Sequence, residues 1–156
     1  MFRGLSPLAL DGKGRLAIPT KYREMLMQRC GGRLVLTMDP DRCLLLYPFS
    51  DWEPIEQKLN ALPSFNPISR QMQRLLVGSA TDTEMDNAGR ILLPATHRGY
   101  AALDKDVMLV GQGNKFEIWD AAAWNERFSG ITELPGKLDE ALRNGEMPDG
   151  LRDFSL

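Results

Sequence analysis

The stretch LDGKGRLAIPTKYR, residues 10–23, returns in altered form as MDNAGRILLPATHR, residues 85–98. In this register the Asp, the Gly before the Arg, the Arg and the Pro are identical, and apolar residues match apolar residues between them. Further along, VLTMDPDRCLLLYPFSDW (35–52) aligns with VMLVGQGNKFEIWDAAAW (107–124), at an offset three residues smaller. A shortening near residues 30–33 reconciles the two offsets. The chain is therefore a tandem duplication, and its fold has to be interpreted as two copies of one unit.

Each copy shows the same predicted order of elements: strand, charged turn, strand, short helix, strand, turn, strand, longer helix. Pro19 and Pro94 end the second strand of each copy, because proline cannot donate to a strand ladder. Residues 21–30 have apolar side chains at helical spacing, and Gly31 offers a stop for that helix. The corresponding helix of the second copy is weaker because Gly99 lies inside it.

The connections also carry signals. DPDR (39–42) and GQGN (111–114) are predicted turns between pairs of short strands. SDWEPIEQKLNALP has apolar residues on one helical face, and in NPISRQMQRLLVG Asn66 suits an N-cap and Pro67 the first helical position. These segments predict a helical hairpin that bridges the copies. After the second copy, PGKLDEALRNG predicts one amphipathic helix.

Neither copy alone is large enough for a stable core. Two half-units of about 45 residues with short strands would each bury too little apolar surface. Intertwining them into one small barrel solves this problem, and the predicted fold class is α+β. We divide the chain into a first half-unit (1–52), a linking helical hairpin (53–80), a second half-unit (81–124) and a C-terminal helix with an acidic tail (125–156).

The composition of the 156-residue chain fits a globular protein in a reducing compartment. It is 43% hydrophobic and 26% charged, has no apolar run of membrane-spanning length, and begins without the apolar core of a secretory signal. Cys30 and Cys43 lack metal-binding spacing, and with one histidine they cannot form a usual zinc site. We therefore expect a cytoplasmic protein with two reduced thiols, no metal and no membrane partner.

Charge is unevenly distributed along the chain. The formal net charge is −2, which speaks against indiscriminate binding to nucleic acid. Residues 1–33 carry seven Lys/Arg and two acidic residues, a net charge of +5. Residues 133–156 carry three Lys/Arg and six acidic residues, a net charge of −3. This asymmetry predicts one positively charged functional face. It also predicts an acidic tail that either keeps the protein soluble or docks on the protein itself.

Enzyme motifs are not found. There is no G-x-S-x-G sequence, and His97, the single histidine, is expected to be a half-exposed helix residue with no nucleophile motif nearby. GKGR (12–15) lacks the spacing and the Ser/Thr of a phosphate-binding P-loop, and GQGN (111–114) lacks the helix that a dinucleotide fingerprint needs. We therefore expect no catalytic residue, no cofactor and no small-molecule substrate.

The repeated Asp-x-x-Gly-Arg turn has an architectural interpretation for its first members. Asp11 and Asp86 can accept hydrogen bonds from backbone N–H groups within the turn. Gly14 and Gly89 can supply the positive φ that such a turn requires. These four residues are therefore predicted to form the turns.

The arginines fit a purely architectural role less well. Arg15 and Arg90 each follow a turn glycine on a hairpin, and Lys13 flanks the first of them. A guanidinium held there presents a planar fork of donors, which suits a phosphate or the O6/N7 edge of guanine in a major groove wide enough for a two-stranded ribbon. The sequence leaves open the alternative that each arginine pairs with the aspartate of its own turn.

Several linked stretches together closely resemble the MraZ family. They are MFRG, LDGKGRLAIPTKYR, CLLLYP, QRLLVGSA, MDNAGRILLP and VMLVGQGNKFEIWD, and the resemblance runs from Met1 to about Trp124. It implies a bacterial protein with two AbrB-like (SpoVT-AbrB) swapped-hairpin half-units in one chain, and hence a β-barrel core. It also implies a DNA-binding transcriptional regulator of the division and cell-wall gene cluster, located at the nucleoid.

The same resemblance implies partners and contact residues. Identical subunits are expected to form a closed ring that binds double-stranded DNA at guanine-rich direct repeats upstream of its own operon. The family's Asp-x₃-Arg motif falls on residues 11–15 and 86–90, so that Arg15 and Arg90 are the expected DNA readers. Phosphate contacts are expected from three first-copy residues: Lys13, Lys21 and Arg23. The second copy has alanine and threonine where the first has the two lysines, which leaves its share of backbone contacts open.

Two other classes of protein remain as alternatives. A ring-forming scaffold would use Arg15 and Arg90 in subunit contacts and bind another protein through helices such as PIEQKLNALP and RQMQRLLVG. A salt-dependent DNA shift assay separates this scaffold from a DNA-binding protein. An enzyme is the weaker alternative because the site motifs are absent.

Overall fold

The computed structural model describes residues 1–152 and residue 154. Contacts divide the chain into two compact units, Met1–Ala122 and Ala123–Leu156. The strands of the described chain all lie in the first unit, and the second is helical. The predicted α+β class is confirmed, whereas the division of the chain at residues 52, 80 and 124 stays a prediction.

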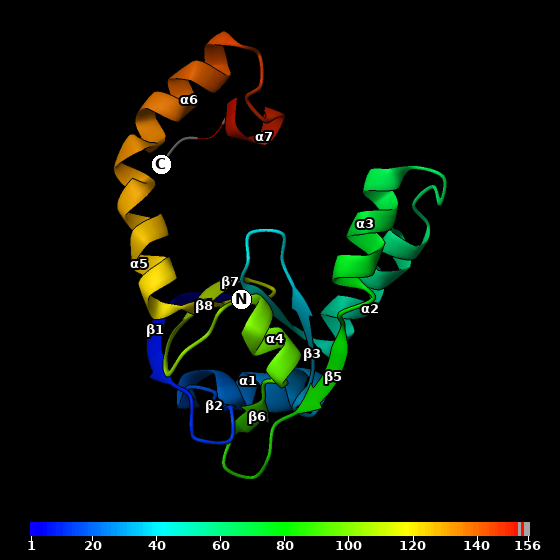
Figure 1. Cartoon of the computed structure of the whole chain (residues 1–156), viewed down its shortest axis with the longest axis vertical. Coiled ribbons are helices and arrows are strands. Elements are labelled where there is room, and N and C mark those ends of the chain that lie inside the picture. The colour runs from blue at the N-terminus through cyan, green and yellow to red at the C-terminus, as the bar shows by residue number, and fades with distance from the viewer. Residues whose placement is uncertain (153, 155–156) are drawn as a thin grey trace. The chain divides into compact units, whose positions relative to one another are not determined.

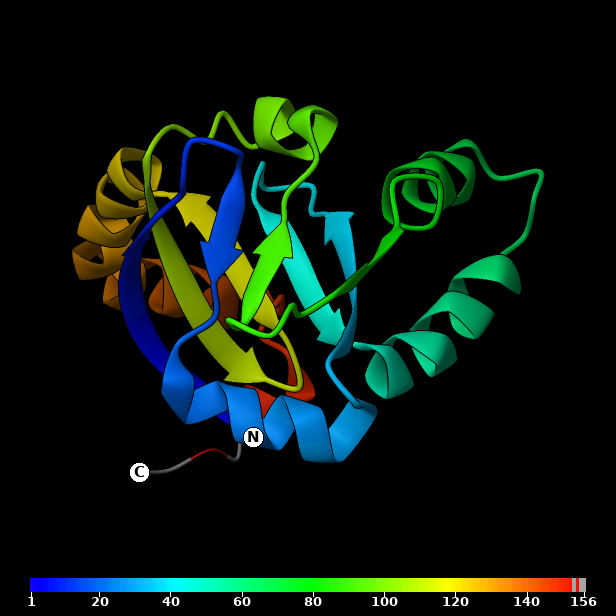
Figure 2. The ribbon, with the colours of Figure 1, turned by 90° about the horizontal axis from the view of Figure 1, so that it is seen from below.

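Six antiparallel strands form the main sheet of the first unit. Across the sheet they lie in the order β1 (Phe2–Ala9), β7 (Asp106–Gly113), β8 (Phe116–Asp120), β4 (Leu44–Pro48), β3 (Arg33–Met38) and β5 (Thr81–Glu84). The other two strands, β2 (Arg15–Ala17) and β6 (Arg90–Leu92), pair with each other as a separate ribbon. Figure 2 shows this ribbon in front of the sheet.

The pairing exchanges strands between the two repeats. β1 of the first copy pairs with β7 of the second, and β5 of the second copy pairs with β3 of the first. β4 pairs with β8 and β2 with β6, so these ladders also join different copies. Among the described strands, only the hairpins β3–β4 and β7–β8 form within a copy. The copies are therefore intertwined, and neither could form this sheet alone.

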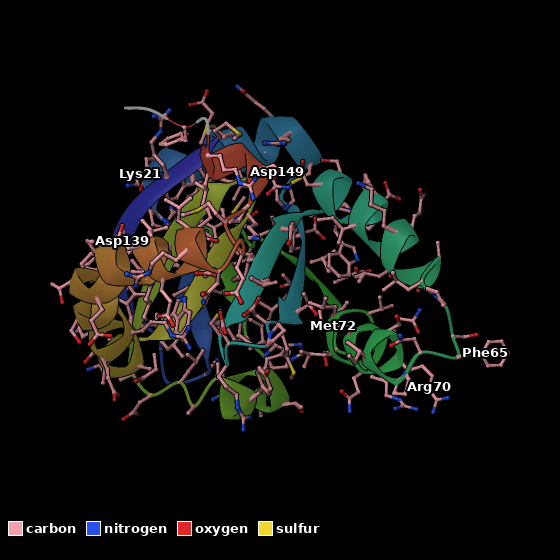
Figure 3. All side chains as sticks on the ribbon, turned by 90° about the horizontal axis from the view of Figure 1, so that it is seen from above. Lys21, Phe65, Arg70, Met72, Asp139 and Asp149 are labelled. Carbon is pink, nitrogen blue, oxygen red and sulfur yellow. The ribbon has the colours of Figure 1, made fainter. Side chains whose placement is uncertain are left out.

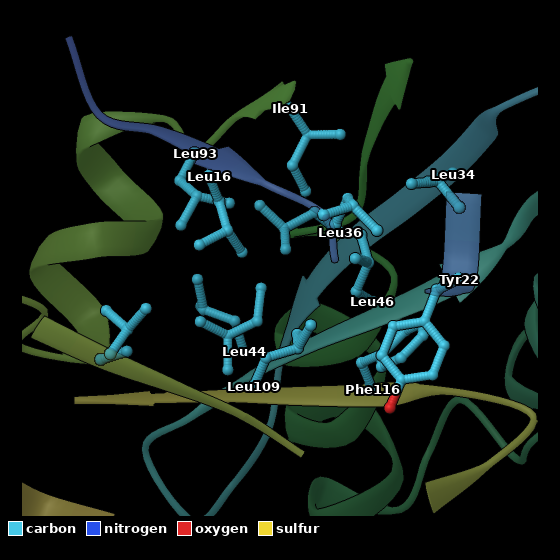
Figure 4. Close-up of a cluster of buried hydrophobic side chains, with 14 of the residues drawn as sticks. Leu16, Tyr22, Leu34, Leu36, Leu44, Leu46, Ile91, Leu93, Leu109 and Phe116 are labelled. Atoms are coloured by element: carbon cyan, nitrogen blue, oxygen red, sulfur yellow. The ribbon is translucent and has the colours of Figure 1, made fainter. Parts of the chain in front are cut away.

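The larger hydrophobic core lies between the sheet and the ribbon (Figure 4). Leu16 and Ile91 from the ribbon are fully buried and belong to one cluster with sheet residues such as Leu44 and Leu109. Hydrogen bonds do not run around a closed barrel in the described residues, because β1 and β5 are the edges of the sheet. The ribbon covers the core by side-chain packing, and the AbrB-like barrel stays a prediction.

The predicted helical hairpin between the copies is confirmed as α2 (Phe49–Asn60) and α3 (Pro67–Leu76). Asn66 caps α3, since its Oδ1 accepts hydrogen bonds from the N–H groups of Ile68 and Ser69 at 2.9 and 3.1 Å. Phe65, in the connection between the two helices, is 95% exposed and points into solvent (Figure 3).

The helical hairpin covers a second, smaller core on the sheet. Its buried residues are Val35, Leu45, Tyr47 and Trp52. Side chains of α2 and Leu76 of α3 pack against this cluster. β3 and β4 are therefore buried on both faces, which explains why their residues are almost all apolar.

Two further helices, α1 (Thr20–Cys30) and α4 (Ala95–Tyr100), follow the ribbon strands in the two copies. α1 ends where predicted, at Gly31, whose φ is 62° and whose N–H donates to Met27 O at 2.9 Å. α4 has only six residues, in keeping with Gly99 inside it. His97 on α4 was expected to be half-exposed, but it is buried with 7% exposure.

The burial of His97 has a structural cause. Its Nε2 lies 2.7 Å from Ser79 O. Because a carbonyl oxygen can only accept, Nε2 carries the proton and donates. His97 thus ties α4 to the segment that joins α3 to β5.

The two predicted turns between paired strands are confirmed. Gly111 pairs with Phe116, and Gln112 N–H donates to Lys115 O at 2.9 Å, so the chain reverses at residues 113–114, within the predicted 111–114. The turn at residues 39–42 lies between β3 and β4 as predicted, and Asp41 N–H donates to Asp39 Oδ2 at 2.8 Å.

The helix predicted in PGKLDEALRNG is confirmed as α6, and the second unit contains other short helical segments besides it. The helices of this unit are the remainder of α5 (Ala121–Ser129), the 3-10 helix η1 (Gly130–Glu133), α6 (Leu134–Arg143) and α7 (Asp149–Arg152). No helix in the described part of the chain is long and apolar enough to cross a bilayer. Cys30 and Cys43 are present as thiols, half-buried and buried.

Candidate nucleic-acid interface

The β2–β6 ribbon presents one exposed face that carries residues of both repeats. Its register pairs Arg15 with Leu92, Leu16 with Ile91 and Ala17 with Arg90. Because successive side chains of a strand point to opposite faces, the burial of Leu16 and Ile91 places the two arginines on the outer face. Figure 1 shows the turns before β2 and before β6 projecting from the same side of the first unit, and Figure 2 views that side.

Loop 1, residues 11–15, is built around the carboxylate of Asp11. Its Oδ1 accepts hydrogen bonds from the N–H groups of Lys13 and Arg15 at 2.9 and 2.8 Å. Its Oδ2 accepts from Nε of Arg15 at 2.7 Å. Gly14 closes the turn with a φ of 78° and donates its N–H to Asp11 O at 3.0 Å. One carboxylate therefore shapes the turn and also fixes the arginine.

Loop 2, residues 86–90, repeats this geometry in the second copy. Asp86 Oδ1 accepts from the N–H groups of Ala88 and Arg90, both at 2.9 Å, and Oδ2 accepts from Arg90 Nε at 2.9 Å. Gly89 has a φ of 74°. The two loops thus have the same hydrogen bonds although the residue before the glycine is lysine in one and alanine in the other.

The Asp–Arg pairing that the sequence left open is present in both loops, and it uses only one nitrogen of each guanidinium. Arg15 and Arg90 donate to their aspartates through Nε, and their side chains are 29% and 38% exposed. Within the described residues, the two terminal nitrogens of each group have no hydrogen-bond partner. The pairing therefore orients the arginine and leaves its outer donors available to a ligand.

The carboxylates of both loops are held in the charged form. Hydrogen bonds from Arg15, first from its backbone N–H and then from its side chain, lower the pKa of Asp11 to about 2. The backbone N–H of Arg90 is likewise the main reason why the pKa of Asp86 is lowered. Both aspartates are therefore anionic wherever the protein is folded near neutral pH.

A pH titration followed by NMR should give Asp11 a pKa of about 2. Since this value lies below the ordinary 3.8, the stability that Asp11 contributes is complete above 3.8 and is lost as the pH falls through about 2. In Arg15→Ala the pKa should rise only part of the way, because the backbone N–H groups of residues 13 and 15 still donate. An ordinary pKa for Asp11 in the wild-type protein would contradict the loop geometry.

The three expected phosphate contacts lie in different surroundings. Lys13 is exposed in loop 1. Lys21 is exposed near the start of α1, with Nζ 4.8 Å from the ring centroid of Tyr22 (Figure 3). Arg23 is half-buried, and its Nε donates to Ile18 O at 2.6 Å. In the described residues no carboxylate pairs with either lysine, whereas a backbone carbonyl holds the guanidinium of Arg23.

Two residues of this surface were missed in the sequence. Arg98, the counterpart of Arg23, donates from Nε to Leu93 O at 2.9 Å, and the aligned repeats already matched these two arginines. Leu92 is 52% exposed on the outer ribbon face, directly opposite Arg15. An apolar residue on the outer face of a strand, opposite an arginine, is the signal that could have identified Leu92.

Possible metal-binding groups and hollows are the remaining features of this surface. Within the described residues, no group of three or more His, Cys, Asp or Glu is placed to hold a metal ion. An open hollow of about 400 Å³ lies beside loop 1. Its lining mixes charges of both signs, with Asp11 and Asp104 beside Arg98 and Lys105.

The two repeats of this chain exchange strands, and each contributes one Asp–Arg turn to the same exposed ribbon. These features define a class of proteins with an internal duplication that present two equivalent arginines to a ligand. The chain belongs to the MraZ family. The family model, described as "MraZ protein, putative antitoxin-like", matches residues 1–75 and again residues 76–142. The two matches reproduce the duplication inferred from the sequence.

Curated relatives carry the name "Transcriptional regulator MraZ". One from Nitrosospira multiformis is 54% identical over 156 residues, and one from Nitrosomonas europaea is 51% identical over 156 residues. One from Pseudomonas putida is 50% identical over 157 residues. Each of these alignments covers 100% of both chains. The family resemblance seen in the sequence motifs is therefore confirmed over the whole chain.

Proposed function

We propose that this protein is a DNA-binding transcriptional regulator whose β2–β6 ribbon reads guanine-rich direct repeats upstream of its own operon, in the division and cell-wall gene cluster. The observation that carries the proposal is the pair of aspartate-oriented arginines on one exposed ribbon. The names of the relatives, which are transcriptional regulators, support the same class.

The chemistry of the loops suits recognition of guanine. A guanidinium end with two free NH₂ groups matches the O6 and N7 acceptors that guanine presents in the major groove. Asp11 and Asp86 occupy Nε, so Arg15 and Arg90 would meet the base with their outer nitrogens. Because the orientation is fixed before binding, less side-chain entropy is lost on contact.

The ribbon supplies further contacts beside the arginines. An α-helix or a two-stranded ribbon fits the major groove. Leu92 on the same face is suited to the methyl group of thymine, and Lys13 and Lys21 are suited to phosphates. Lys13, Arg15 and Lys21 belong to the positively charged segment 1–33 and support this face as the one that meets DNA, whereas Arg29 of the same segment is paired with Asp51.

The proposal includes self-assembly and location. A closed homo-oligomeric ring would place many copies of the ribbon on one DNA, which compensates for the feeble long-range attraction of a chain with a net charge of −2. A protein that binds operator DNA in this way would be found at the nucleoid, in the cytoplasm.

A footprint on the DNA upstream of the protein's own gene tests the proposal. We expect protection over short direct repeats at physiological ionic strength, and loss of protection when guanines in the repeats are replaced. Binding that disappears at physiological salt, or protection with no dependence on guanine, would favour the alternative of a ring-forming scaffold.

Lys13→Ala should weaken binding to every DNA sequence alike. Each phosphate contact that is lost reduces the slope of log affinity against log salt by about 0.9. Lys58→Ala is the matched control, because Lys58 is exposed on α2, which packs on the smaller core and not on the ribbon. Affinity measured by fluorescence anisotropy between low and physiological salt gives both slopes. An unchanged slope in Lys13→Ala would place its side chain away from the DNA.

A further inference from the structure

Arg98 belongs to the second repeat, yet its guanidinium packs against loop 1 of the first. A Cβ built on Gly14 would lie 2.8 Å from Cζ of Arg98, so the guanidinium covers the Cα of this turn residue. Arg98 Nε donates to Leu93 O at 2.9 Å, and the N–H of Leu93 donates to Gly14 O at 3.0 Å. Arg98 thus touches loop 1 directly and also through the backbone of Leu93.

Arg23 stands in the mirror relation to loop 2. A Cβ built on Gly89 would lie 2.6 Å from Cδ and from Cζ of Arg23. Arg23 Nε donates to Ile18 O at 2.6 Å, and the N–H of Ile18 donates to Gly89 O at 2.9 Å. The first repeat therefore supports the loop of the second by the same set of contacts.

The crossing follows from the antiparallel ribbon. Because β2 pairs with β6 in opposite directions, the end of β6 and the start of α4 lie beside loop 1. The end of β2 and the start of α1 lie beside loop 2 for the same reason. Each loop glycine leaves room for a flat group at the place where a Cβ would stand. A guanidinium fills this place and keeps an Nε donor for the carbonyl next to it.

We propose that Arg98 and Arg23 are crossed positioning residues, each of which holds the DNA-contacting loop of the opposite repeat. The proposal rests on the proposed DNA-binding function, and it replaces the expectation that Arg23 contacts a phosphate. Arg98 sets the geometry in which Asp11 aims Arg15, and Arg23 does the same for Arg90. The two loops are then coupled through the fold, so that a substitution in one repeat alters the DNA-facing turn of the other.

Double-mutant cycles test the crossing. On DNA from upstream of the protein's own gene, Arg98→Ala should lower the affinity about tenfold and leave the salt slope unchanged. In the background of Arg15→Lys, which keeps a weaker guanine contact, Arg98→Ala should lower the affinity much less. In the background of Arg90→Lys, Arg98→Ala should still lower the affinity about tenfold. Arg23→Ala should show the reverse pattern. Coupling within a repeat, equal coupling to both loops, or a salt slope reduced by about 0.9 would overturn the proposal.

A second readout needs no DNA. Hydrogen exchange of the Gly14 and Arg15 amides should become faster in Arg98→Ala, while the amides of loop 2 keep their rates. Arg98→Lys should behave like Arg98→Ala, since lysine keeps the charge but has no planar fork. Full rescue by lysine, or faster exchange in the wrong loop, would contradict crossed positioning. If wild-type protein shows no preference for the operator, the proposed function fails, whereas the exchange pattern still decides whether the loops are supported across the repeats.

Discussion

Arg15→Ala is expected to abolish sequence-specific DNA binding while the protein keeps its fold and its oligomeric state. The loss of one bidentate contact to a base costs about 1–3 kcal/mol, a factor of about 5 to 150 for one loop, and the factor multiplies over subunits that bind together. The stability effect should be small, because the Arg15–Asp11 pair is partly exposed and such surface pairs contribute about 0–1 kcal/mol.

Competition with unrelated DNA measures the specific part of the binding, and thermal unfolding measures stability. Arg70→Ala is the matched control, since Arg70 is exposed on α3 and points away from the protein body (Figure 3). The control removes the same charge and should bind like the wild type. Wild-type binding by Arg15→Ala, or unfolding of this variant, would show that Arg15 has a structural role instead.

The turn residues could be predicted from the sequence because each of them carries a local signal. Asp11 reaches backbone N–H groups two and four residues ahead, and Gly14 is required by its own φ of 78°. The duplication then transfers both assignments to the second copy. The order of strands and helices follows from similarly local patterns, which explains why α1, α3 and the short α4 lie where they were predicted.

The partners of the loops could not be predicted in this way. An alignment of the two repeats shows that Arg23 corresponds to Arg98, but it does not say which strands pair across the copies. Because β2 pairs with β6, each arginine lies against the glycine of the other repeat. The burial of His97 is also a tertiary outcome, since it depends on Ser79 O lying near α4.

Two or more operator repeats in phase are expected to bind at least about 10²-fold more tightly than one isolated repeat. A single chain with a net charge of −2 attracts DNA weakly at long range, and its positive residues 1–33 act only when they are gathered on one side of an assembly. Once one ribbon has docked, the next meets its repeat at an effective concentration near the millimolar scale. Avidity then exceeds single-site affinity by a factor of about 10²–10⁴ without any new kind of contact.

Phase should matter as much as number. Neighbouring ribbons on one side of the duplex can reach their repeats together only when these are separated by about one helical turn, 10–10.5 base pairs. Inserting about half a turn between two repeats should therefore return the affinity to that of one repeat, whereas a full turn should restore part of it, depending on the reach of the assembly. Anisotropy titrations with one repeat, two repeats in phase and two repeats out of phase measure all three cases at constant salt. Tight binding to one isolated repeat would exclude the multivalent mechanism, even if Arg15 and Arg90 remain the residues that read the bases.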